Sequence, residues 1–264
     1  MKAVILAGGF GSRLSEETTT TPKPLLEIGG YPILLHIMQI YANNGVTDFI
    51  VLAGYKGYLI KEYFIDFMNH IQDLTVELET GKITYLNGYR KRPQWTITII
   101  DTGEATMTGG RLLRVKHLLE NERHFALTYG DGVSDIDIRK LEAFHLSHNQ
   151  IGTVTAVKPP GRFGALELDG TSVSQFTEKP MGDGAYINGG FFILRPAIFE
   201  YLKNGDSCVF EQEPLQQLAR TNQLNAYVHD GFWQCMDTLR DKQYLDSLCR
   251  KNDAPWLLQG RVGQ

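Results

Sequence analysis

Near its start the chain reads AVILAGGFGSRL, residues 3–14. Five consecutive apolar residues, Ala3–Ala7, predict a buried parallel strand, and the glycines that follow predict a loop at its carboxyl end. Backbone N–H groups of such a glycine-rich turn can point at phosphate oxygens. The stretch therefore predicts an α/β fold with an anion site at the end of its first strand.

Further strands and helices alternate along the chain. Further strands are predicted at 49–53, 96–100, 125–129 and 153–157, and helical spacing is found at 33–41, 58–67, 112–119 and 136–148. This alternation predicts a doubly wound, mostly parallel sheet. After Pro159 the expected strands are shorter, at 165–168, 173–178 and 186–194, and they precede helices near 211–220 and 239–249. We expect this second part to add a smaller subregion.

Composition narrows the class of protein. The chain has 264 residues, of which 42% are hydrophobic, and that suffices for one large α/β domain. A net charge of −4 argues against a nucleic-acid-binding surface. Three cysteines without a Cys-x-x-Cys pair argue against disulfides or a zinc site and favour a reduced, cytoplasmic chain. No apolar run reaches about 18 residues, so we expect neither a signal peptide nor a membrane span.

The segment 73–94 fits neither the helical nor the strand period. Its mixture of polar and aromatic residues predicts an excursion from the sheet. We expect either a loop or a contact between subunits there.

The glycine loop differs from the two commonest phosphate loops. Leu14 stands where a dinucleotide loop needs its third glycine, and no Gly-Lys-Ser/Thr follows for a Walker loop. Two cations accompany it: Arg13 at its end and Lys23 between Pro22 and Pro24. Because prolines restrict the backbone on both sides, this lysine loses less entropy when it engages phosphates. The alternative is a tight turn with a solvated lysine.

The run Leu-Ala-Gly-Gly-x-Gly-Ser/Thr-Arg-Leu followed by Pro-Lys-Pro resembles the signature of the sugar-1-phosphate nucleotidyltransferases. The resemblance spans residues 1 to about 239 and implies a Rossmann-like nucleotidyltransferase fold in one domain, 1–264. About 1–158 would bind the nucleotide and about 159–264 the sugar. It implies catalytic roles for Arg13 and Lys23. It also implies nucleotide binding by the loop residues Leu6, Ala7, Gly8, Gly9, Phe10, Gly11 and Ser12, where Ser12 replaces the more usual threonine.

Two aspartates are candidates for Mg²⁺, the cofactor that the resemblance implies. Asp131 follows the strand 125–129 directly after Gly130, which we count with the nucleotide site, and ligands bind at such strand ends. Asp237 lies beside Phe232 and Trp233, and both aspartates match the metal-binding positions of the family. Mg²⁺ prefers carboxylate oxygen and water. Asp135 and Asp137 compete, but they are expected to cap the helix that begins near residue 136.

The sugar phosphate is assigned through two short motifs. Glu178-Lys179-Pro180 follows a predicted strand, and Ile187-Asn188-Gly189 begins another. Alone, the first motif is typical of an exposed turn and the second of a turn or bulge. The resemblance reverses that weighting and implies that Glu178, Lys179 and Asn188 bind the sugar phosphate.

The loop 101–112 lies between a strand and a helix, so its amides and hydroxyls can face the same crevice and read a base edge. Candidates are Thr106, Gly109, Gly110 and Arg111; alternatively, Thr108 caps the helix. Arg111 is harder to explain structurally, since cations are unfavourable at a helix start. The runs TGGRL (108–112), FWQCMDTLRD (232–241) and PPGRFGAL (159–166) resemble the cytidylyl branch of the family.

The resemblance implies CTP and glucose 1-phosphate as substrates and CDP-glucose and pyrophosphate as products. Alternatives are the same reaction with dTTP or UTP and a catalytically silent sugar-nucleotide sensor, while an NAD-dependent oxidoreductase is disfavoured by the missing third glycine. Relatives of this kind form oligomers. They supply nucleotide sugars for cell-surface polysaccharides, and the cytidylyl branch serves lipopolysaccharide O-antigens. We expect no nucleic-acid or membrane partner.

Overall fold

The strands of the central sheet pair mostly in parallel, as the sequence predicts. The fold is seen in a computed structural model that describes residues 1–264 apart from 12–13, 87–92, 160–164, 170, 178–184 and 258–264. Within the described residues, no helix is long and apolar enough to cross a membrane.

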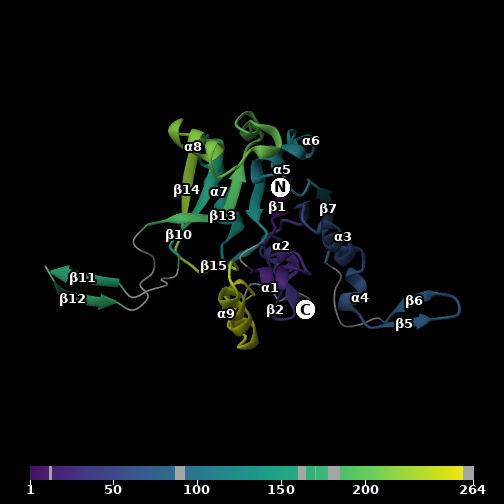
Figure 1. The fold of residues 1–264 in the computed structure, drawn as a ribbon. Coiled ribbons are helices and arrows are strands. Elements are labelled where there is room, and N and C mark those ends of the chain that lie inside the picture. Colours follow the sequence, from purple (N-terminus) through teal and green to yellow (C-terminus); the bar gives the residue numbers. More distant parts are fainter. Residues whose placement is uncertain (12–13, 87–92, 160–164, 170, 178–184, 258–264) are drawn as a thin grey trace.

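A seven-stranded sheet forms the centre of the molecule (Figure 1), in the order β14-β10-β13-β8-β1-β4-β7. All neighbours pair in parallel except β13, which is antiparallel to both β8 and β10. The bounds are β1 (Lys2–Ala7), β4 (Asp48–Ala53), β7 (Thr96–Asp101), β8 (Phe125–Tyr129), β10 (Gly152–Val157), β13 (Ile187–Leu194) and β14 (Leu224–His229).

Helices cover both faces of this sheet. Side chains of β1 alternate between two apolar clusters: Ala3, Ile5 and Ala7 belong to one, and Val4 and Leu6 to the other. The first cluster includes residues of α2 (Ile33–Asn43), α3 (Gly57–Ile65), α7 (Ile138–Leu146) and α9 (Leu239–Arg250), and the second those of α5 (Thr108–Arg114), α6 (Lys116–Leu119) and α8 (Glu213–Arg220). The doubly wound α/β fold is therefore confirmed.

Shorter elements complete the described chain. These are α1 (Ser15–Thr18), α4 (Phe67–Ile71) and the 3-10 helices Lys23–Leu25, Pro196–Glu200, Gly205–Ser207 and Pro255–Leu257. Four two-stranded sheets pair β2 (Glu27–Ile28) with β3 (Tyr31–Pro32), β5 (Leu74–Glu77) with β6 (Lys82–Tyr85), β9 (Gly132–Ser134) with β15 (Trp233–Cys235), and β11 (Ala165–Asp169) with β12 (Ser172–Thr177).

Several predicted elements are corrected. The strand expected at 186–194 in an appended subregion is β13, inserted into the main sheet between β8 and β10. The helix expected to begin at Leu112 begins at Thr108 and breaks at Val115. The excursion predicted at 73–94 is present, and it contains the β5–β6 hairpin, which extends away from the sheet (Figure 1). Sequence patterns did not predict β9, β14 or β15.

Buried histidines lie where α7 packs on β10. His145 is fully buried, and its Nδ1 lies 2.9 Å from the Thr153 hydroxyl, while its Nε2 has no hydrogen-bond partner in the described part of the chain. Burial, helped by the nearby His148, Arg195 and His124, lowers the pKa of His145 to about 3. His145 is therefore held neutral in the folded protein.

Because this folded-state pKa lies below the ordinary value of 6.5, the stability it confers is fully present above pH 6.5 and is lost progressively as the pH falls toward 3. Between pH 7 and pH 5 we expect a loss on the order of 2 kcal/mol from this residue. His145→Asn removes the titration, and urea unfolding at both pH values measures the difference. The exposed His117→Asn serves as control. Equal pH dependence in wild type and His145→Asn would contradict the assignment.

Candidate active site

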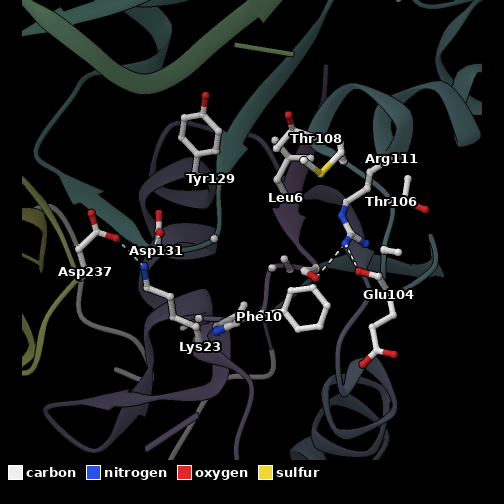
Figure 2. A pocket seen from close by; sticks show the side chains of 18 residues that line it. Leu6, Phe10, Lys23, Glu104, Thr106, Thr108, Arg111, Tyr129, Asp131 and Asp237 are labelled. Atoms are coloured by element: carbon white, nitrogen blue, oxygen red, sulfur yellow. Dashed lines mark hydrogen bonds and ion pairs between the residues drawn. The ribbon is translucent and has the colours of Figure 1, made fainter. Parts of the chain in front are cut away.

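A pocket of about 380 Å³ opens at the carboxyl ends of β1 and β8 (Figure 2). Figure 2 shows Lys23, Asp131 and Asp237 on one side of it and Arg111, Glu104 and Thr106 on the other. The pocket is lined by Leu6, Ala7, Gly8, Gly9, Phe10, Gly11, Lys23, Pro24, Glu104, Ala105, Thr106, Met107, Thr108, Arg111, Tyr129, Gly130, Asp131 and Asp237. The predicted glycine loop and both predicted metal ligands therefore meet at the carboxyl ends of these strands.

The glycine loop leaves β1 in a conformation that suits glycine. Gly11 has φ +64°, and a Cβ there would come within 2.8 Å of the Thr18 side chain, whose hydroxyl donates to the Gly11 carbonyl at 3.1 Å. A Cβ on Gly8 would overlap the guanidinium of Arg111. Glycine thus allows the positive φ at residue 11 and the close packing of Arg111 against residue 8. Ser12 and Arg13, predicted to act beside it, lie outside the described residues.

Arg111, a candidate for contact with the nucleotide base, lines the pocket and makes several hydrogen bonds within the protein. Its side chain belongs to α5, is only 4% exposed and lines the pocket wall. One terminal nitrogen donates to Thr102 Oγ1 and the Gly103 carbonyl, both at 2.7 Å, and the other to the carbonyls of Gly8 at 2.9 Å and Glu104 at 3.2 Å. These contacts explain a cation near a helix start, since the guanidinium fastens the glycine loop to the loop after β7.

The loop 101–112 is corrected at three further positions. The amides of Gly109 and Gly110 donate to the Cys208 carbonyl, at 2.9 and 3.1 Å, and neither glycine lines the pocket. Thr108 does not cap α5; its hydroxyl donates to Glu211 Oε2 at 2.6 Å. Only residues 104–108 of this loop, with Arg111, reach the pocket.

A short strand pair brings the two aspartates together. Asp131 precedes β9 and Asp237 follows β15, and these strands pair antiparallel, with the Met236 amide donating to the Asp131 carbonyl at 2.8 Å. Thr238, the next residue, caps α9 in a reciprocal capping box with Asp241. The β9–β15 pairing before Asp237 and the helix cap after it thus hold Asp237 close to Asp131, although the two are far apart in the sequence.

Lys23 is ion-paired with both aspartates. Its Nζ lies 2.7 Å from Asp131 Oδ2 and 2.8 Å from Asp237 Oδ1, and its side chain is 13% exposed. Burial lowers the pKa of Lys23, but the two carboxylates raise it by more, so the net pKa is above its ordinary value. The amine of Lys23 is therefore charged while it lies beside the two carboxylates. The sequence predicted all three residues for the site but not that they bind one another.

The groups around Asp131 and Asp237 leave carboxylate oxygens as the available metal ligands. Cys235 Sγ donates to Asp237 Oδ2 at 3.7 Å, and burial together with the nearby carboxylates raises the pKa of this thiol to about 12. The thiol therefore stays protonated at neutral pH and offers no thiolate to a metal. Two carboxylates converging on one point fit Mg²⁺, which usually keeps several waters and uses one or two carboxylates.

The competing aspartates take structural roles. Asp137 caps α7, since its carboxylate accepts from the amides of Arg139 and Lys140, as predicted. Asp135 does not cap the helix. Its Oδ1 lies 3.0 Å from Nε2 of His229, the last residue of β14.

The predicted sugar residues are only partly described. Glu178 and Lys179 lie outside the described residues. Asn188 is exposed and does not line the pocket; its Nδ2 donates to the Tyr129 hydroxyl at 3.1 Å. That hydroxyl in turn donates to Glu211 Oε1 at 2.7 Å, and burial, with Glu211, raises the pKa of Tyr129. Sequence reasoning missed Tyr129 and Glu211. Tyr129 ends a buried strand next to Gly130, a position that could have indicated it, whereas Glu211 carries no local signal.

Comparison with known proteins decides the family. The family model described as Nucleotidyl transferase matches residues 2–245. The chain belongs to that family. It is 52% identical to a glucose-1-phosphate cytidylyltransferase of Salmonella typhi over 97% of this chain and 98% of that one, and 30% identical to a mannose-1-phosphate guanyltransferase of Neurospora crassa over 94% and 64%. The solved structure of HddC from Yersinia pseudotuberculosis shares the fold, with TM-score 0.67 and 24% identity over 95% and 99%.

Replacing Arg111 tests whether its hydrogen bonds stabilise the fold and the nucleotide site that a nucleotidyl transferase needs. We expect Arg111→Lys to lower the free energy of unfolding by about 3 kcal/mol, because an ammonium cannot satisfy carbonyls arranged around a planar fork. Nucleotide binding should weaken with it, as the glycine loop loses its anchor. Urea unfolding and nucleotide titration measure the two effects.

Arg114→Lys is the matched control. Arg114 lies on the same helix and pairs with Asp206 at 2.6 Å, but at the surface. Its replacement should leave the urea midpoint nearly unchanged. Similar midpoints for both variants would contradict a structural role for Arg111.

Proposed function

We propose that the protein transfers a cytidylyl group from CTP to α-D-glucose 1-phosphate, giving CDP-glucose and pyrophosphate. The observation that carries the proposal is the meeting of Lys23, Asp131 and Asp237 beside the glycine loop at one strand edge. The choice of base and sugar follows the relative in Salmonella typhi, with which the chain shares half of its residues over nearly its whole length.

The nucleotide would lie along the wall formed by residues 6–11. Backbone amides of the glycine loop, together with Ser12, Arg13 and Gly130, would bind the triphosphate, and Thr106 would contact the base from the loop after β7. Thr106 lines the pocket on the side opposite Lys23 (Figure 2). We assign this half to residues 1–158 of a single domain.

The sugar phosphate would be bound by the second half, residues 159–264. Glu178 would accept from sugar hydroxyls, Lys179 would guide the phosphate, and Asn188 would contribute from β13. The hydrogen bond from Asn188 to Tyr129, a pocket residue, supports this placement, because it joins β13 to the wall of the nucleotide site.

Asp131 and Asp237 would hold Mg²⁺, which offsets charge near the α-phosphorus when it is bound. Their carboxylates converge on the Lys23 amine, so their oxygens can reach a common point. No group of three potential metal-ligating side chains exists among the residues described. Two suffice for this ion, since water and substrate phosphate complete its coordination.

The reaction is an in-line displacement. A phosphate oxygen of the sugar phosphate forms a bond to the α-phosphorus while the bond from that phosphorus to the bridging oxygen of pyrophosphate breaks. No protein nucleophile is needed, and the protonated thiol of Cys235 supplies none. Catalysis then consists of positioning and charge stabilisation by Arg13, Lys23 and Lys179.

Pyrophosphate release tests the proposed substrates. With glucose 1-phosphate we expect kcat/KM for CTP to exceed that for dTTP or UTP about tenfold or more. Asp131→Asn should abolish most of the activity with CTP, whereas Asp137→Asn, which alters only a helix cap, should retain it. A preference for dTTP or UTP would reassign the base, and no pyrophosphate from any triphosphate would favour a non-catalytic sensor.

We also propose that the protein is a homo-oligomer and that the β5–β6 hairpin contributes to the subunit contact. The hairpin extends from the body (Figure 1) and exposes Leu78 at 92%, with Val76 and Ile83 about half exposed. Two-stranded hairpins are marginally stable alone. An apolar groove of about 550 Å³, lined in part by Phe64 and Trp95, offers a surface that a second copy could cover.

Introducing charge on the hairpin tests this contact. We expect Leu78→Asp combined with Ile83→Asp to convert the assembly into smaller species, because a carboxylate buried in an apolar contact is costly. Light scattering after size-exclusion chromatography measures the mass. Tyr244→Asp, at an exposed position on α9, is the control. An unchanged mass in the double variant would place the contact elsewhere.

We place the enzyme in the cytoplasm, where its product would serve synthesis of bacterial cell-surface polysaccharides such as lipopolysaccharide O-antigen. Cys208, Cys235 and Cys249 are all free thiols, as expected in a reducing compartment.

A further inference from the structure

One amine contacts both of the carboxylates assigned to the metal. Lys23 Nζ lies within hydrogen-bond distance of Asp131 Oδ2 and of Asp237 Oδ1. Figure 2 shows the lysine side chain rising between the loop and the two acids, with its nitrogen at their carboxylates. Lys23 therefore occupies the point at which the two acidic groups converge.

An ammonium and a divalent cation compete for these two oxygens at close range. Two like charges a few ångströms apart repel strongly in a partly buried site, where screening by water is weak. A metal held by both carboxylates therefore requires Lys23 to move away. Conversely, removal of the lysine charge leaves two ionised carboxylates side by side, which repel each other and attract a cation.

The backbone of Lys23 limits where its amine can go. Pro22 and the buried Pro24 flank it, and it begins a 3-10 helix, so its backbone is more restricted than its side chain. The same pocket contains the glycine loop, the proposed phosphate site. A triphosphate bound there offers the amine a second set of anionic oxygens.

We propose that Lys23 closes the metal position in the nucleotide-free protein and releases Asp131 and Asp237 when a triphosphate takes over its charge. The inference rests on the proposed metal site and adds to it a coupling between metal and nucleotide. Each ligand favours the lysine position that the other needs, so metal and triphosphate bind with positive cooperativity.

Binding of Mn²⁺ to the nucleotide-free protein tests the inference without any catalytic readout. The probe is Mn²⁺ itself, and electron paramagnetic resonance measures the fraction that remains free. We expect Lys23→Met to bind Mn²⁺ about tenfold or more tightly than wild type, because the competing charge is gone. Lys23→Arg keeps that charge and should bind as weakly as wild type. Equal affinity in wild type and Lys23→Met overturns the inference.

Thermal unfolding provides a second measurement. Without metal, Lys23→Met should melt below wild type because its two carboxylates have lost the charge of the lysine, and Mn²⁺ should raise its midpoint more than that of wild type. Lys23→Gln, whose neutral amide can donate to one carboxylate, should respond in the same direction. Lys116→Met removes an exposed charge on α6 and should respond like wild type. A Mn²⁺ response in Lys23→Met no larger than in wild type contradicts the inference.

A double variant separates the inference from the proposed function. Lys23→Met with Asp131→Asn should lose the tight Mn²⁺ binding if Asp131 is a ligand; retained tight binding would place the ion elsewhere and overturn the inference. If wild type makes CDP-glucose but Lys23→Met gains no Mn²⁺ affinity, only the inference fails. If Lys23→Met gains that affinity but wild type makes no CDP-glucose, the proposed function fails and the inference stands.

Discussion

The guanidinium of Arg111 holds together the ends of three neighbouring strands. It donates to Gly8 just after β1, to Ala53 at the end of β4, and to Thr102 and Gly103 just after β7. A buried guanidinium is tolerated only when its donors are satisfied, so these oxygens must stay converged. The convergence sets the direction in which the glycine loop leaves the sheet. The wall of the pocket formed by the glycine loop therefore depends on the guanidinium of Arg111.

The opposite wall also consists of a cation among oxygens, but its chemistry differs. Arg111 donates to neutral carbonyls and a hydroxyl of the strand ends and the loops that follow them. Lys23 is surrounded by ionised carboxylates, which another cation can bind. The rigid fork suits the permanent contact, and the compact ammonium on a flexible stem suits the exchangeable one. The arginine thus holds the permanent contacts of the fold, and the lysine makes the contacts that a ligand can replace.

The sequence predicted the parts of the fold that are buried on both faces. β1 and β4 each contain five consecutive apolar residues, and β8 is also mostly apolar, because helices cover both sides of the sheet there. β9 and β15 escaped prediction, since strands of three residues carry too little periodicity, although their pairing is what brings Asp131 to Asp237. The residues of the site could be predicted, but their mutual contacts depend on tertiary pairing. Arg111 illustrates the difference: its position was identified, but its role depends on carbonyls from three strands.

β13 connects the two halves of the chain physically. Because it lies between β8 and β10, the second half forms part of the same sheet that carries the nucleotide loop. Glu211 strengthens the connection: one carboxylate oxygen accepts from Thr108 in the nucleotide wall, and the other from Tyr129, which also accepts from Asn188 of β13. A shift of Asn188 toward a sugar would alter the hydrogen bonding of Tyr129 and, through Glu211, that of Thr108. The two proposed substrate sites therefore share one hydrogen-bond network, which favours treating residues 1–264 as a single working unit.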